Sequence, residues 1–177
     1  MEPANRKLIR PSFTEAKAET ALSESLGVRK VIWLGDGLMN DHTDGHVDNL
    51  ARFTAPGVVA CPMAFGLDDP NAGAYDLAAE TLAGAVDAQG RRLRVVRIPS
   101  PGRIKDQEHR TLPASHMNFL IANGAVIVPV YDDLAGGFAV EAVETLFPDR
   151  HVIGLPSLAL LSGGGSFHCI SQQVPAA

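Results

Sequence analysis

A histidine and an aspartate two residues apart, His46 and Asp48, have the types and spacing that acid–base chemistry needs. If the segment 44–49 (DGHVDN) enters a β-strand, both side chains point to the same face. An imidazole beside a carboxylate is suited to moving protons as a general acid and base. A hydrogen-bonded turn that carries a surface histidine explains the same residues. The spacing alone leaves both interpretations open.

The same stretch also offers four alternating residues that bind metals in other proteins, namely His42, Asp44, His46 and Asp48. Imidazole and carboxylate groups bind zinc and iron. However, four consecutive alternating ligands rarely form one site, because the usual set of three protein ligands and a water draws on separated segments. The pattern therefore favours a site without a metal.

A cysteine near the end of the chain, Cys169, follows a run of three glycines at 163–165. Glycine tolerates unusual φ values, so the backbone here could approach a ligand closely and expose a nucleophilic thiol. The alternative is a small buried hydrophobic residue, which is the commoner fate of a single cysteine and which Cys61 fits well inside an apolar strand. No Lys-Ser/Thr pair follows the glycines, so they do not form a phosphate loop.

The elements that must position these residues repeat along the chain. Three apolar runs, 29–34, 93–100 and 150–157, read as strands, and each follows a helical pattern. We expect the first helix to begin at Ser12 and end at Gly27, because Glu15 completes a capping box. The apolar face of the second helix, which is expected to end near Gly90, consists of Tyr75, Ala78, Ala79, Leu82 and Val86. The third uses Ala139, Ala142, Val143 and Leu146, and is expected to end at Pro148.

Two further repeated pieces read as β-hairpins. Residues 46–50 run on to 56–62, and residues 116–120 run on to 123–129, with a glycine near each turn. The repeating unit is therefore hairpin, helix and strand, and the chain holds about two and a half copies of it. Units of this kind close into a ring or stack, because one unit cannot bury its own apolar face.

The composition is that of a globular α/β protein. The 177 residues carry 15 Lys+Arg and 20 Asp+Glu, a net charge of −5, with 46% hydrophobic residues. This composition excludes disorder, and the acidic balance argues against a nucleic-acid partner. We expect a single domain in the cytoplasm, because the chain shows neither an apolar membrane span nor a signal peptide, and two cysteines make no disulfide framework.

Several of these segments resemble the agmatine deiminases of the Porphyromonas-type peptidyl-arginine deiminase family. The similar segments are 31–34 with 40–49, 121–124 with 128–129, and 163–173. The resemblance covers nearly the whole chain, 1–177, and implies part of a five-bladed α/β propeller with pseudo-fivefold symmetry, the pentein fold. It agrees with the repeat found in the sequence.

The resemblance also implies a reaction, the hydrolysis of agmatine to N-carbamoylputrescine and ammonia, a step in putrescine biosynthesis, without a metal or organic cofactor. Cys169 would attack the guanidinium carbon and His46 would move the protons. Asp48 would hold guanidinium N–H groups, and Asn118 would bind substrate beside it. The acidic net charge weakly favours a cationic guanidine as the partner.

The chain departs from the family pattern in ways that predict weak activity. The family carries an aspartate in a Trp-x-Arg-Asp segment and a glutamate in a Glu-Gly-Gly segment, and this sequence has neither. We therefore expect the C-terminal half of such an enzyme, weak or inactive alone, which would need the N-terminal half or a second copy. The alternatives are a deiminase of free or peptidyl arginine or another guanidine, and a non-catalytic chain that needs a partner.

Overall fold

The first of two similar units contains a three-stranded sheet. The computed structural model describes residues 14–41 and 45–174. Strands β1 (Arg52–Ala55) and β2 (Val58–Met63) form an antiparallel hairpin. Helix α2 (Ala72–Gly84) then crosses over the sheet, and β3 (Arg94–Pro99) returns parallel to β2. The sheet order is β1-β2-β3.

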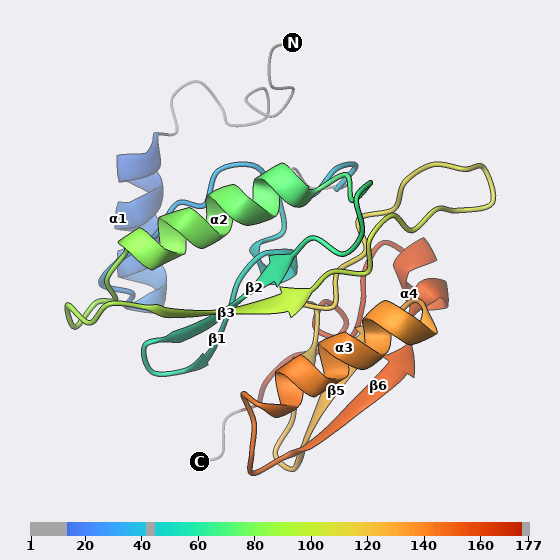
Figure 1. Cartoon of the computed structure of the whole chain (residues 1–177). Helices are drawn as coiled ribbons and strands as arrows, with labels where there is room; N and C mark the ends of the chain where they lie inside the picture. Colours follow the sequence, from blue (N-terminus) through green and yellow to red (C-terminus); the bar gives the residue numbers. More distant parts are fainter. Residues whose placement is uncertain (1–13, 42–44, 175–177) are drawn as a thin grey trace.

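The second unit repeats this plan. Strands β4 (Leu120–Ile121) and β5 (Ala125–Val130) are antiparallel, helix α3 (Asp133–Glu144) crosses over, and β6 (His151–Pro156) pairs parallel with β5. The short helix α4 (Leu158–Ser162) follows. Figure 1 shows the two units side by side, with α3 lying between β3 and its own sheet. The predicted α/β class and the order of hairpin, helix and strand are confirmed for these two copies. The predicted first strands of the hairpins, 46–50 and 116–120, are wrong, because these strands are β1 and β4 instead.

Two apolar clusters hold the units together. In the first unit, the predicted helix face packs on β2, with Tyr75, Ala78, Ala79 and Leu82 all buried. In the second unit, Ala139 and Val143 of α3 are fully buried against Val126 and Val128 of β5. The amphipathic spacing of each helix therefore gives the face that covers its sheet.

Both helices end before the predicted residues. Helix α2 ends at Gly84 rather than near Gly90, and Val86 of the predicted face lies beyond it. A tight turn forms instead, in which Asp87 accepts hydrogen bonds from the backbone N–H groups of Gln89 and Arg91. Helix α3 ends at Glu144, ahead of Pro148. After α2, the Asp87 side chain that caps its own turn competes with helix continuation.

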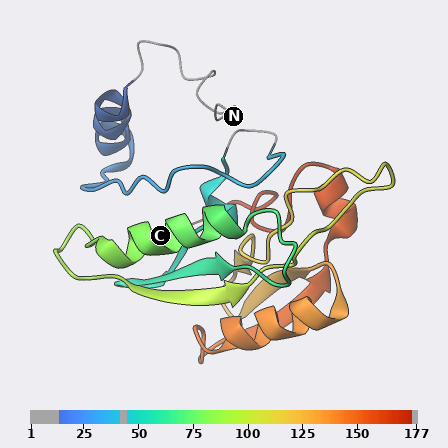
Figure 2. The ribbon, with the colours of Figure 1, turned by 45° about the horizontal axis from the view of Figure 1, so that its top comes forward.

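The first predicted helix and strand differ from expectation. Helix α1 (Glu15–Leu26) ends at Gly27, as predicted, but its N-cap is Thr14, and Ser12 lies outside the described residues. The predicted strand 29–34 is wrong, because this segment has no strand partner among the described residues. Ile32 and Leu34 pack against the first cluster instead. Figure 2 shows α1 at the margin of the molecule, and none of its residues is buried.

No helix within residues 14–41 and 45–174 combines the length and apolar character that a membrane crossing requires.

Candidate active site

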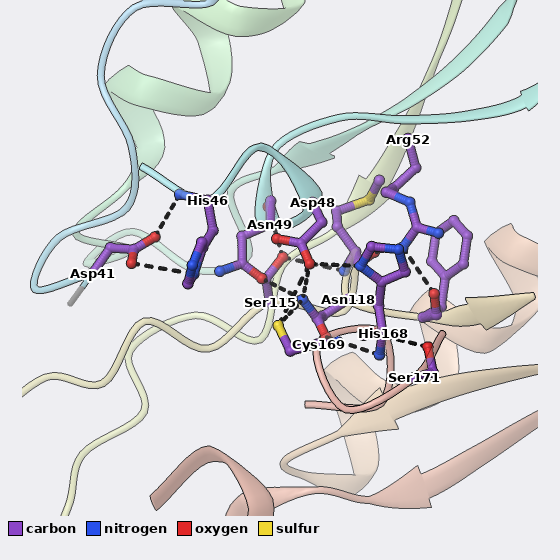
Figure 3. Close-up of polar contacts among 12 residues, drawn as sticks. Asp41, His46, Asp48, Asn49, Arg52, Ser115, Asn118, His168, Cys169 and Ser171 are labelled. Atoms are coloured by element: carbon purple, nitrogen blue, oxygen red, sulfur yellow. Dashed lines mark hydrogen bonds and ion pairs between the residues drawn. The ribbon is translucent and has the colours of Figure 1, made fainter. Parts of the chain in front are cut away.

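Asp48 lies on a single helical turn, not on a strand. Residues Val47–Asn49 form the 3-10 helix η2, which is closed by hydrogen bonds from the N–H groups of Leu50 and Ala51 to the carbonyl oxygen of Val47. The expected strand across 46–48 is therefore wrong, and the two side chains diverge. His46 turns toward Asp41, whereas Asp48 turns toward His168 and Cys169 (Figure 3).

The Asp48 carboxylate receives three contacts at one oxygen. Its Oδ2 lies 2.7 Å from His168 Nδ1, and accepts hydrogen bonds from Asn118 Nδ2 at 2.9 Å and from Cys169 Sγ at 3.5 Å. Burial disfavours the charged form, but the hydrogen bonds from His168 and Cys169, together with nearby imidazole charge, outweigh burial. They hold the pKa of Asp48 below its usual range. The carboxylate is therefore negative at neutral pH.

Asn118 joins the carboxylate, the thiol and the loop that carries the thiol. Its Nδ2 donates to Asp48, to Asn49 Oδ1 at 3.1 Å and to Cys169 Sγ at 3.1 Å. Its Oδ1 accepts from the backbone N–H groups of His168 and Cys169, at 3.1 and 3.3 Å. Asn118 is only 2% exposed. Whether Asn118 also contacts substrate stays a prediction. In the structure, its hydrogen bonds hold the loop that carries His168 and Cys169.

Because Asn118 satisfies so many partners, we expect its removal to loosen the site. Asn118→Ala leaves buried donors and acceptors unpaired, which should lower the free energy of unfolding by about 1–3 kcal/mol. Amide exchange in the loop 165–171 should also become faster. Urea unfolding and hydrogen exchange with mass spectrometry measure the two effects. The exposed Asn123 provides the control, since Asn123→Ala should change stability by less than about 0.5 kcal/mol. Unchanged exchange in Asn118→Ala would contradict the role.

The thiol of Cys169 is exposed, whereas that of Cys61 is not. Cys169 follows α4 and the glycine run, and a Cβ added at Gly165 would lie 3.0 Å from the Cys169 Cβ. A glycine is needed there because the turn folds back on the cysteine. Burial raises the pKa of the Cys61 thiol to about 11, so that thiol is not nucleophilic at neutral pH. Cys61 is thus the small buried residue that its strand predicted.

His46 and Cys169 line the same small pocket. The pocket has a volume of about 20 Å³, and its walls include Asp41, Asn118 and Ser166. His46 Nδ1 lies 3.4 Å from Asp41 Oδ1, and its backbone N–H donates to Asp41 Oδ2 at 2.9 Å. A pocket of this size, with polar groups among its walls, has room for about one water molecule. An imidazole and a thiol therefore line one water-sized space.

Two neighbours of the candidate site residues were not predicted from the sequence, His168 and Arg52. Arg52 donates hydrogen bonds to the carbonyl oxygens of Met117 and Phe119, at 3.3 and 2.8 Å, and its guanidinium lies 4.8 Å from the Phe119 ring centre. These carbonyls flank Asn118, so Arg52 fixes the backbone on both sides of it. Burial lowers the pKa of Arg52, and the charges of Asp48 and Cys169 oppose that shift. The position of His168 directly before Cys169 was the one available signal.

The metal alternative receives no support from the residues that the structure describes. No three His, Cys, Asp or Glu side chains in 14–41 and 45–174 gather as metal ligands do. Two of the four candidate ligands, His42 and Asp44, lie outside the described residues. The other two, His46 and Asp48, face different partners.

The comparisons with known proteins agree with one another. The chain is 40% identical to an agmatine deiminase of Pseudomonas syringae pv. tomato, across 94% of this chain and 50% of the relative. The structure of the Enterococcus faecalis agmatine deiminase superimposes with a TM-score of 0.87 at 37% identity, covering 93% of this chain and 50% of that one. A C. jejuni agmatine deiminase determined with substrate bound gives a TM-score of 0.77 at 28% identity.

The chain spans about half the length of the curated relatives it matches. A family profile described as Porphyromonas-type peptidyl-arginine deiminase matches residues 5–175, which is nearly the whole sequence. This protein is a member of the Porphyromonas-type peptidyl-arginine deiminase family.

Proposed function

We propose that this chain carries the nucleophile of an enzyme that hydrolyses agmatine to N-carbamoylputrescine and ammonia. The observation that carries the proposal is the exposed Cys169 thiol, which lies within hydrogen-bond distance of Asn118 and Asp48 and shares a pocket with His46. A thiol, an imidazole and a carboxylate are the groups that a covalent displacement at a guanidinium carbon requires.

In the first half of the reaction, the Cys169 thiolate forms a bond from Sγ to the guanidinium carbon. The bond from that carbon to one terminal nitrogen breaks, and His46 supplies the proton with which ammonia leaves. An amidino-thioether remains on Cys169. A bound guanidinium favours this step, because a neighbouring cation lowers the pKa of a thiol.

In the second half, a water in the pocket between His46 and Cys169 attacks the same carbon. His46 takes a proton from this water, the bond from carbon to Sγ breaks, and the ureido product leaves with the thiolate restored. The water-sized volume of the pocket supports this assignment. The rest of the substrate must lie outside this pocket, because agmatine is far larger than one water.

Asp48 binds the guanidinium in this proposal. Its three contacts with the described part of the chain all reach Oδ2, so Oδ1 is the oxygen that accepts a guanidinium N–H. Its lowered pKa keeps the carboxylate charged across the neutral range. A charge-assisted hydrogen bond of this kind orients the guanidinium as well as attracting it.

We infer further that the two observed units belong to a five-unit propeller, and that the 177-residue chain turns over agmatine slowly by itself. The resemblance assigns two more guanidinium-binding carboxylates to segments that this sequence lacks. The missing charge would lower the rate by roughly 10²–10⁴. The other half of the propeller, or a second copy, would supply what is missing, and the product would lead to putrescine in the cytoplasm.

The test is ureido-product formation from agmatine, free arginine and a peptidyl-arginine substrate at equal concentrations. We expect agmatine to give the highest kcat/KM, because the two similar structures with TM-scores of 0.87 and 0.77 are agmatine deiminases. The family description makes peptidyl arginine the second candidate. A preference for either arginine substrate would change the substrate but keep the mechanism. Product without dependence on Cys169 would overturn the mechanism.

A further inference from the structure

Two buried serines, Ser157 and Ser166, face each other beside the turn that carries Cys169. Their hydroxyl oxygens lie 2.6 Å apart. Ser157 is 0% exposed and Ser166 is 2% exposed, so bulk water does not compete for this hydrogen bond. The serine pair therefore closes the segment that consists of α4 and the glycine run at its two ends.

Ser157 is a fixed point in the second unit. Its N–H donates to the carbonyl oxygen of Val130 at the end of β5, at 3.0 Å, and its carbonyl oxygen accepts from the N–H of Leu161 in α4, at 2.9 Å. A serine in front of a helix usually caps it with its side chain. The Ser157 side chain makes no such bond to α4, and its hydroxyl bonds to Ser166 instead.

Ser166 begins the turn that presents the thiol. Its carbonyl oxygen accepts a hydrogen bond from the N–H of Ile170 at 3.1 Å, so the turn 166–170 encloses Cys169. Ser166 also lines the water-sized pocket together with Gly165 and Cys169. Any displacement of Ser166 therefore moves the backbone that leads into the nucleophile.

The turn is held from two sides. Asn118 holds the N–H groups of His168 and Cys169, whereas the serine pair ties the start of the turn to the end of β5 through Ser157. The distances from Cys169 Sγ to Asn118 Nδ2, 3.1 Å, and to Asp48 Oδ2, 3.5 Å, depend on both attachments. Covalent displacement is sensitive to such geometry, since a shift of about 1 Å can cost about 10²-fold in rate.

We propose that Ser157 and Ser166 are positioning residues that hold the Cys169 thiol in place for attack on the guanidinium carbon. The inference rests on the proposed deimination, and both serines act through the turn rather than by touching substrate. Removal of either hydroxyl leaves the other buried and unpaired, and the turn must shift to give it a new partner. Asp48, which binds the guanidinium in the proposed mechanism, lies on η2 outside this turn. The loss should therefore fall on kcat more than on KM.

The experiment measures kcat and KM for agmatine in Ser157→Ala, Ser166→Ala and the double variant of this chain. We expect kcat to fall about 10- to 100-fold in each single variant, with KM within about threefold of the parent. Both single variants break the same hydrogen bond, so the double variant should be at most about twofold slower than the slower of them. Additive losses would show that the serines act separately and would contradict the pair.

Alkylation of Cys169 by iodoacetamide at pH 7 adds a measurement that needs no turnover. The Asn118 amide donates to Cys169 Sγ, so a displaced turn loses a hydrogen bond that favours the thiolate. We expect the alkylation rate of Cys169, followed by mass spectrometry, to fall at least about threefold in both single variants.

Ser100→Ala is the matched control. Ser100 is also 2% exposed and its hydroxyl donates to Asp69, but neither residue lines the pocket. Circular dichroism and urea unfolding verify that each variant folds. The control should lose stability as the pair variants do, yet keep kcat and the alkylation rate of Cys169 within about twofold.

The outcomes separate this inference from the proposed function. A parent chain that formed no product dependent on Cys169 would contradict the proposed function, and the alkylation rates would still decide whether the serine pair positions the thiol. Unchanged alkylation in both serine variants would overturn the positioning role. So would an unchanged kcat, or losses of rate that Ser100→Ala reproduces.

Discussion

We expect Cys169→Ala to reduce ureido-product formation from agmatine at least about 10⁴-fold, to the background of the assay. In the proposed mechanism the sulfur forms the bond to the guanidinium carbon, so its removal eliminates the covalent route and leaves only binding and proton transfer. The surrounding hydrogen bonds survive in part, because Asn118 still holds the backbone N–H groups of residues 168 and 169. The measurement compares both proteins, alone and together with the unmatched half of a relative.

Cys61→Ala is the matched control for this prediction. Cys61 is the other cysteine of the chain, fully buried and with a pKa raised to about 11. We expect this variant to keep the rate. Alkylation by iodoacetamide adds a readout that needs no turnover, since Cys169 should be modified at neutral pH and Cys61 should not. Residual activity in Cys169→Ala within tenfold of the parent would contradict nucleophilic catalysis by this residue.

The two complete units could be predicted because their signals are local. The face of α2, from Tyr75 to Leu82, follows a helical period, and the runs that become β3 and β6 are β-branched and continuous. Both runs form strands although neither is buried on both faces, and β6 has no buried residue. The glycine turns of the hairpins, at Gly57 and Gly124, are equally local. Local patterns and tertiary packing point to the same structure in these regions.

The segment 29–34 shows the limit of this reasoning. Its sequence is as strand-like as that of β3, yet it is not a strand in the structure. A strand exists only when a neighbour accepts its backbone hydrogen bonds, and the sequence of the segment itself does not say whether that neighbour is present. The same limit explains Val47–Asn49, where alternation favoured a strand but local backbone hydrogen bonds closed a helical turn.

The site itself was predictable only as a set of residues. His46, Asp48, Asn118 and Cys169 could be selected by type and by family resemblance, but their contacts could not. The pair of Asp48 and His168 joins positions 120 residues apart, and Arg52 supports the backbone around Asn118 from 65 residues away or more. Such contacts depend on how η2, β4 and the last loop pack against one another. The spacing of residues in the sequence does not predict that packing.

The second large effect is expected from Asp48→Asn, which should lower kcat/KM for agmatine by about 10²–10⁴. The change keeps the shape but removes the negative charge that contacts His168 and that, in the proposed mechanism, binds the guanidinium. Because the pKa of Asp48 is lowered in the folded protein, its ionisation stabilises the fold above the unfolded value near 4. That contribution is lost as the pH falls through the lowered folded pKa. The variant should therefore have a lower free energy of unfolding than the parent at neutral pH. On acidification, its free energy of unfolding should fall by less than that of the parent.

Asp76→Asn separates the site effect from a general loss of surface charge. Asp76 forms an ion pair with Arg97 at 2.9 Å, and its side chain is 67% exposed, so its neutralisation should leave kcat/KM within about twofold. Steady-state kinetics at pH 7 and urea unfolding between pH 3 and pH 7 measure both effects for both variants. If Asp48→Asn kept its kcat/KM while losing stability, the carboxylate would serve to hold His168 and the cysteine loop. Guanidinium binding would then have to come from another carboxylate of the complete enzyme.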